Sequence, residues 1–155
     1  MMRFLYTNDD GALCVVNAAA KSDLEKVLGP LTDDAYKEHV LTRSIPEGKL
    51  YVEIADSYTL PDREFRNAWM LEGKAVGHDL EKARKMQLDR IRAAREPKLV
   101  ELDKEFMFAL ENSDDKKLLD VKAAKQLLRD ITEPLKTMAL NSIDDVKSAF
   151  PDLLK

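Results

Sequence analysis

The chain has 155 residues, of which 45% are hydrophobic, 35% are charged and 6% are aromatic, and its formal net charge is −4. This composition is typical of a folded protein and excludes a disordered, low-complexity chain. The negative charge argues against a general nucleic-acid binder, because nonspecific affinity comes mostly from neutralised phosphates.

The first elements form a predicted β-hairpin over Arg3–Val16. Its two arms, Phe4–Thr7 and Ala12–Val16, are apolar and rich in β-branched residues. Between them, Asn8–Gly11 supplies residues that tolerate a positive φ in a tight turn.

Two helices and a strand follow. The sequence Ser-Asp-Leu-Glu at 22–25 has capping-box spacing and predicts the start of a short helix, which Gly-Pro at 29–30 ends. Thr32 can cap a second helix that runs to about Leu41. After a Pro-Glu-Gly turn, Leu50–Ile54 reads as a strand.

The segment 61–78 connects these elements to the rest of the chain. Pro61–Trp69 is predicted as a short helix or turn, and Trp69–Gly77 as a second hairpin around Gly73. Trp69 is the only tryptophan, and its large apolar surface favours burial. We expect it to be a structural plug between the N-terminal unit and the helices.

From Asp79 onward the apolar spacing is helical. One predicted face consists of Leu80, Ala83, Gln87, Ile91 and Ala94. A second, rotated face consists of Leu99, Leu102, Phe106, Ala109 and Leu110. Pro97 lies between the two sets and removes a helix hydrogen bond, so the pattern predicts either one long helix kinked near Pro97 or two helices broken there.

A further helix is predicted after Asn112–Asp115, where Ser113 or Asp114 can serve as its N-cap. Its apolar stripe is Leu118, Val121, Ala124, Leu128 and Ile131. The short linker predicts that the two helices are antiparallel neighbours. One short helix over Ser142–Phe150 completes the chain.

Together these elements predict an α+β fold. We expect a small α+β unit with β-α-α-β order at 1–60, a connector with a hairpin at 61–78, a helical hairpin at 79–134 and a short C-terminal helix at 135–155.

The residues that carry catalytic or metal chemistry are not grouped in this sequence. His39, His78 and Cys14 are isolated from one another, without the spacing of a zinc site. Asp-Asp pairs at 9/10, 33/34, 114/115 and 144/145 fall in turns or at helix starts, where carboxylates accept backbone N–H bonds. The five glycines form no phosphate-binding loop. We therefore expect no enzymatic activity, no metal and no cofactor.

The charges are distributed unevenly along the chain. Up to residue 78 there are nine Lys and Arg against thirteen Asp and Glu, and from residue 79 there are sixteen of each. The densest cations are Lys82, Arg84, Lys85, Arg90, Arg92, Arg95 and Lys98. Asp89 and Glu81 have the spacing of intrahelical ion pairs with Arg92 and Lys85. The stretch 82–98 is open to three interpretations: a solvated face, a contact with acidic protein surfaces, or a nucleic-acid site.

Three consecutive apolar residues, Phe106, Met107 and Phe108, stand near the C-terminal end of the predicted long helix. Successive side chains on a helix point about 100° apart, so one buried face cannot take all three. Apolar surface is left for a partner. The predicted partner contacts are Arg90, Arg92, Arg95, Phe106, Met107 and Phe108.

Several segments taken together resemble a known family. They are FRNAWMLEGKAV at 65–76, DLEKAR at 79–84, IRAAREPKL at 91–99, LDKEFMFALE at 102–111 and KQLLRDIT at 125–132. In this order they are similar to small proteins of tailed bacteriophages and prophages grouped as phage tail assembly chaperone-like. The resemblance covers about 65–134.

This resemblance implies a non-enzymatic role in building tails or tail fibres, either as a transient chaperone or as a small structural component. The implied partners are phage tail or tail-fibre proteins and further copies of the chain, in the host cytoplasm and in the virion tail if the protein remains there. The single cysteine is consistent with a reducing compartment. No apolar leader and no run of about 18 apolar residues is present, so we expect no membrane association. A nucleic-acid-binding regulator that uses 82–98 is the alternative.

Overall fold

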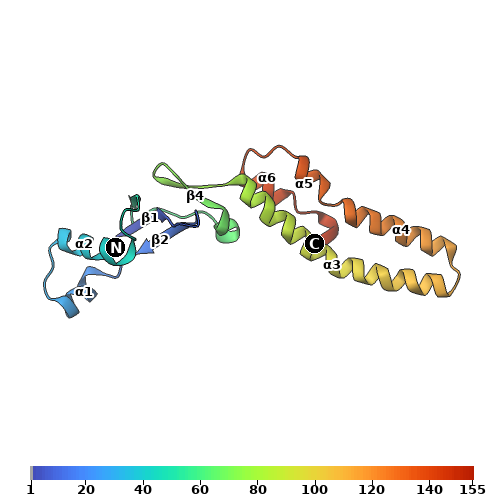
Figure 1. Ribbon diagram of the computed structural model, residues 1–155, viewed down its shortest axis with the longest axis horizontal. Helices are drawn as coiled ribbons and strands as arrows, with labels where there is room; N and C mark the ends of the chain where they lie inside the picture. The colour runs from blue at the N-terminus through green and yellow to red at the C-terminus, as the bar shows by residue number, and fades with distance from the viewer. Residues whose placement is uncertain (1) are drawn as a thin grey trace. The chain divides into compact units, whose positions relative to one another are not determined.

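The computed structural model describes residues 2–155. The chain divides into two compact units, Met1–Asp79 and Leu80–Lys155. Every strand of the described residues lies in the first unit, and the second is built from helices. The predicted α+β fold is confirmed (Figure 1).

The first unit is built on an antiparallel sheet with strand order β2-β1-β3. Strands β1 (Arg3–Thr7) and β2 (Leu13–Asn17) form the predicted hairpin, and β3 (Tyr51–Ile54) pairs with the other edge of β1. In the turn, the Ala12 N–H donates to Asn8 Oδ1 at 2.8 Å and Gly11 has a φ of 75°. The hairpin therefore has the turn chemistry that its sequence predicts.

Helix α1 (Lys21–Leu28) begins two residues earlier than a capping box at Ser22 requires. Its N-cap is Ala20, which has no side chain that accepts a hydrogen bond. The carboxylate of Glu25 accepts the N–H of Leu31 at 3.2 Å, beyond the opposite end of the helix. Because this contact draws Glu25 away from the N-terminus, the capping-box prediction is wrong. Gly29, with a φ of 82°, ends the helix as expected.

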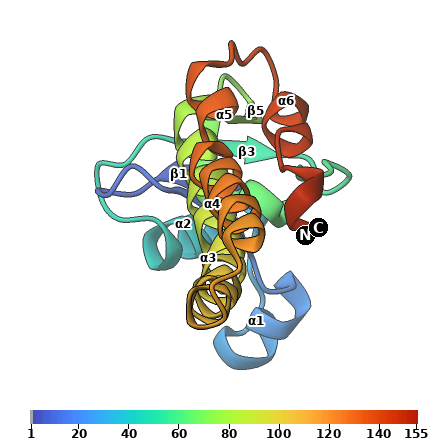
Figure 2. The same ribbon diagram turned by 90° about the vertical axis from the view of Figure 1, so that its right-hand side faces the viewer.

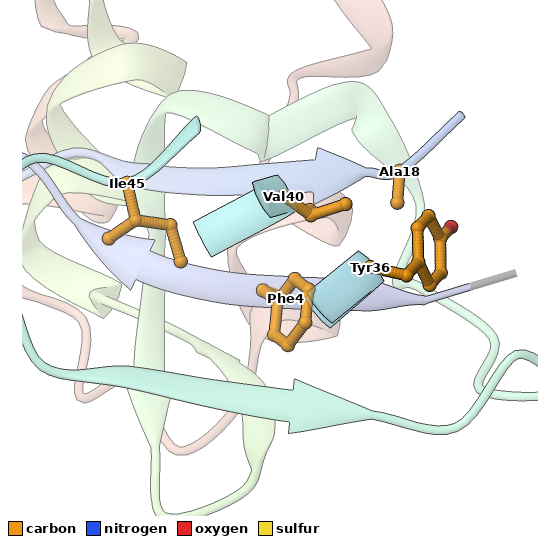
Figure 3. Packing of buried hydrophobic residues seen from close by; sticks show 5 residues of the cluster. All are labelled: Phe4, Ala18, Tyr36, Val40 and Ile45. Atoms are coloured by element: carbon orange, nitrogen blue, oxygen red, sulfur yellow. The ribbon is translucent and has the colours of Figure 1, made fainter. Parts of the chain in front are cut away.

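Helix α2 (Asp33–Ser44) is capped by Thr32, whose hydroxyl accepts the Ala35 N–H at 3.2 Å. The helix continues past the predicted end near Leu41. It places Tyr36 and Val40 against the sheet, and Figure 3 shows both near Phe4. The complete cluster is Phe4, Ala18, Tyr36, Val40 and Ile45.

The opposite face of the sheet carries a second cluster. Successive residues of a strand point to opposite faces, so Leu5 faces away from Phe4. A turn of 3₁₀ helix, η1 (Arg63–Ala68), leads into the predicted hairpin, β4 (Trp69–Glu72) and β5 (Ala75–His78). The cluster is Leu5, Leu13, Ile54, Trp69 and Val76.

Trp69 is buried, as predicted. All the buried residues of its cluster belong to the first unit, so Trp69 is a core residue of that unit. Its expected role as a plug against the helices stays a prediction.

The second unit begins with the long helix α3 (Leu80–Glu111), which continues through Pro97. The continuity of the helix is confirmed, and the alternative of two helices broken at Pro97 is wrong. The predicted kink near Pro97 stays a prediction. Proline leaves the carbonyl of Ala93 without its usual helical donor. Both Ala93 and Pro97 are exposed, so water can take the place of that donor.

Helix α4 (Asp115–Asp130) packs beside α3 in both views (Figures 1 and 2). Asp114 is its N-cap and accepts the Lys117 N–H at 3.0 Å, while Ser113 takes a positive φ of 52°. The predicted stripe faces inward, with Val121 and Leu128 buried. Leu110, predicted on the inner face of α3, is exposed.

The remaining residues form three short elements: α5 (Glu133–Thr137), α6 (Ile143–Ser148) and the 3₁₀ turn η2 (Asp152–Leu154). We call residues 131–155 the C-terminal strap. Helix α5 was not predicted, since five residues are too few to show a helical period. The buried core of this unit joins Ile91 and Leu128 to Leu135 and Leu154 of the strap.

Candidate interaction surface

Arg84 of α3 binds the C-terminal end of α5. Its Nη1 donates to the carbonyl of Lys136 at 3.1 Å, and its Nη2 donates to the carbonyl of Met138 at 2.8 Å. Carbonyls at the end of a helix have no partner within the helix and carry the negative end of its dipole. The guanidinium donates to these carbonyls and places a positive charge at the negative end of the dipole, so it caps α5.

Three further side chains of α3 act in the same way. Arg95 Nη1 donates to the carbonyl of Arg129 at 3.3 Å, in the last turn of α4. Gln87 Nε2 donates to the carbonyl of Lys147 at 3.4 Å, in the last turn of α6. The fourth donor is Lys98, whose Nζ binds the carbonyl of Leu153 in η2. A polar side chain of α3 therefore meets the C-terminal end of each of α4, α5, α6 and η2.

These four donors occupy one side of α3, which we call the donor face. Positions 84, 87, 95 and 98 follow one another at spacings of three, eight and three residues, close to one, two and one turns of a helix. Ala83 and Ile91, both fully buried, lie on the same side. Much of the basic stretch is thus an inner surface of the second unit.

The three arginines predicted as partner contacts differ in their burial and in their own contacts. Arg92 is exposed and pairs with Asp89 at 2.7 Å, which confirms that predicted ion pair. Glu81 pairs with Arg84 at 3.5 Å, so the predicted pair of Glu81 with Lys85 is wrong. Arg90 is half-buried. Arg95, predicted as a partner contact, is half-buried with its guanidinium on an internal carbonyl.

The three consecutive apolar residues of α3 also differ in burial. Phe106 is half-buried beneath the cations of α4, with Lys125 Nζ 4.8 Å and Lys122 Nζ 5.9 Å from the ring centroid. Met107 and Phe108 point outward and are 53% and 68% exposed. The prediction that one face cannot bury all three is confirmed.

Met107 and Phe108 form part of a shallow groove on the outer side of α3. Its lining is Val100, Asp103, Lys104, Met107, Phe108 and Glu111. On α4, Leu119 and Leu127 are also exposed. The helical hairpin therefore presents apolar side chains on both of its helices beyond those its core uses.

A second groove, of about 350 Å³, lies between α3, α4 and η2. Its lining is Lys98, Glu101, Leu102, Glu105, Ala124, Leu127, Leu128 and Leu153. Glu105 is paired with Lys117 at 2.6 Å, and Lys98 holds Leu153, so two of its three charged side chains already have partners.

The aspartates of the predicted Asp-Asp pairs accept hydrogen bonds from backbone N–H groups or form ion pairs with lysine. Asp114 and Asp145 cap α4 and α6, which confirms the capping interpretation at those positions. Backbone N–H groups of Asn141 and Ser142 lower the pKa of Asp145. A hydrogen bond from Lys21, at 2.7 Å, lowers the pKa of Asp33.

Within residues 2–155, no three His, Cys, Asp or Glu side chains are grouped in a way that could hold a metal ion. Over the same residues, no helix combines the length and the apolar character that a membrane span requires.

Comparisons with known protein families, with curated proteins and with solved structures found no match to this chain.

The donor face was missed by sequence reasoning, although one signal pointed to it. Gln87 falls among apolar residues on the predicted inner face of α3, where a polar side chain needs an internal partner. The identity of that partner could not be predicted, because the carbonyl of Lys147 lies 60 residues further along the chain.

Proposed function

We propose that this chain is a non-enzymatic protein of bacteriophage tail assembly, acting through protein–protein contacts in the building of tails or tail fibres. The observation that carries the proposal is the exposure of Met107 and Phe108 beside Val100 on the outer side of α3. Contiguous exposed apolar groups of this kind commonly mark protein-binding surfaces. The tail context comes from the resemblance of 65–134.

The test is co-purification from phage-producing cells with the chain as bait. A tail or tail-fibre protein should be captured by the wild type, and Met107→Ser/Phe108→Ser should reduce capture at least tenfold. Val27→Ser is the matched control, because Val27 is an exposed apolar residue of the other unit. A chain that stays monomeric and captures no tail protein would overturn the proposal.

Mass spectrometry of purified phage particles distinguishes a structural tail component from a transient chaperone. A structural component should be present in mature virions. A transient chaperone should be present in assembly intermediates and absent from virions.

The alternative of a nucleic-acid-binding regulator has weaker support. Arg84, Arg95 and Lys98 donate to carbonyls of their own unit, and Arg92 is paired with Asp89. These contacts reduce the cationic groups that the stretch 82–98 can offer to phosphates. Retention of DNA or RNA at low salt, weakened by Arg90→Ala/Arg92→Ala, would favour the alternative.

A further inference from the structure

The strap is attached to α3 by a particular kind of polar contact. Arg84, Gln87 and Lys98 all donate to backbone carbonyls of the strap. A carbonyl offers the same acceptor whatever side chain its residue carries. These bonds therefore hold the ends of the short helices without depending on strap side chains.

The same contacts leave buried polar atoms unsatisfied. Gln87 is 2% exposed, and its Oε1 is buried without a hydrogen-bond partner. The Nε atoms of Arg84 and Arg95 are buried and unpartnered as well. Such groups regain hydrogen bonds with water when their cover is removed. These unsatisfied atoms along the donor face therefore destabilise the closed position of the strap.

The strap itself has little internal support. Its helices have five, six and three residues, too short to be stable without tertiary packing. A cavity of about 460 Å³ lies between α5 and the segment that joins α6 to η2. Its buried apolar side chains are Leu135, Val146 and Leu154, whereas Ile131, Leu140, Ala149 and Phe150 are partly buried against the core.

The pairing of α3 with α4 has contacts in which the strap takes no part. Lys117 pairs with Glu105 at 2.6 Å, and Lys125 pairs with Asp103 and lies over the ring of Phe106. On the same hairpin, Ala109 and Val121 are buried. These contacts remain when the strap is removed from α3.

We propose that the C-terminal strap is a latch that opens from the donor face as a unit while α3 and α4 stay paired. Opening uncovers Gln87 and Ile91 and gives water access to the unpartnered atoms of Arg84 and Gln87. The closed latch shields that face of α3, and the open latch presents it.

Hydrogen exchange of the full chain, read residue by residue, tests the latch. The reporter amides are those of Met138, Ala149 and Leu154, each hydrogen-bonded within the strap. The reference amides are those of Val121 and Leu128 in α4. We expect the reporters to exchange at least tenfold faster than the references, with both sets protected relative to an unfolded chain.

Two substitutions move the latch in opposite directions. Gln87→Met keeps the length of the side chain and removes its unpartnered oxygen, while the carbonyl of Lys147 keeps the N–H of Phe150 at 3.4 Å. It should slow strap exchange about tenfold. Arg84→Met removes two bonds to α5 and should speed strap exchange about tenfold. Lys85→Met, at the exposed neighbouring position, is the matched control and should change neither set.

Equal exchange of strap and α4 amides in the wild type would overturn the latch, because the unit would then open only as a whole. It would also be overturned if Gln87→Met and Arg84→Met moved both sets of amides equally. Neither result depends on which partner the protein binds, so the latch and the proposed function fail independently.

Discussion

Asp145 shows how one side chain can organise a segment of backbone. Its carboxylate accepts the N–H groups of Asn141 at 2.8 Å and Ser142 at 2.9 Å, and Ser142 Oγ accepts the Asp145 N–H at 3.3 Å. This capping box satisfies donors that the start of α6 would otherwise leave open. The same donors stabilise the ionised carboxylate, which lowers its pKa from the ordinary value of 3.8.

The lowered pKa predicts how α6 responds to acid. The contribution of Asp145 is fully present above the unfolded-state pKa of 3.8 and is lost as the pH falls through the lower folded-state value. We expect the stability of α6 to decline below pH 4. Asp145→Asn, which cannot ionise, should lack this part of the decline. Titration of the carboxyl carbon by NMR measures the pKa directly, and a value at or above 3.8 would contradict the prediction.

At the scale of an element, α4 carries two neighbouring leucines in opposite environments. Leu128 is 4% exposed within the core of the second unit, while Leu127 is 67% exposed. Removing a buried leucine side chain costs transfer free energy and leaves a cavity. The pair is therefore a matched test of which face of α4 stabilises the fold.

We expect Leu128→Ala to lower the free energy of unfolding by about 2–5 kcal/mol. Leu127→Ala should change it by less than about 0.5 kcal/mol, as is usual for surface substitutions. Urea denaturation followed by circular dichroism measures both. Equal losses for the two variants would mean that the outer face of α4 is covered in solution, for example by a second copy.

Elements whose signals are local could be predicted from the sequence. The turn at Asn8–Gly11 and the caps at Thr32 and Asp114 depend on residues within four positions of one another. The capping box at Ser22 has the same kind of local signal but was wrong. There, Glu25 has a competing acceptor role beyond the other end of α1, at Leu31.

Contacts between distant residues could not be predicted in the same way. The basic residues of α3 looked like a solvated or binding face, because their partners are backbone carbonyls 34 to 55 residues away that no side-chain pattern reveals. The separation of Phe106 from Phe108 was foreseen from helical geometry. The cations that cover Phe106 come from α4 and were not foreseen.

At the scale of the whole molecule, each unit has its own core. The clusters around Phe4 and Trp69 belong to residues before Leu80, and the cluster around Ile91 belongs to residues after it. A unit with its own core can fold alone.

We therefore expect the isolated fragment 80–155 to be helical by circular dichroism and to unfold cooperatively with urea. Ile91→Asp in the same fragment should abolish the cooperative transition, because an unpaired charge would replace a fully buried side chain. A wild-type fragment without a cooperative transition would show that this unit needs the first one to fold.

The use of main-chain acceptors by α3 has a consequence for how the sequence can vary. Lys136, Met138, Lys147 and Leu153 can be replaced by other residues without loss of the carbonyls that bind Arg84, Gln87 and Lys98. Arg84 and Lys98 on α3 have no such freedom, since each must keep a donor that reaches a particular carbonyl. Substitutions at the two ends of the same bond are thus tolerated unequally, and the constraint falls on α3.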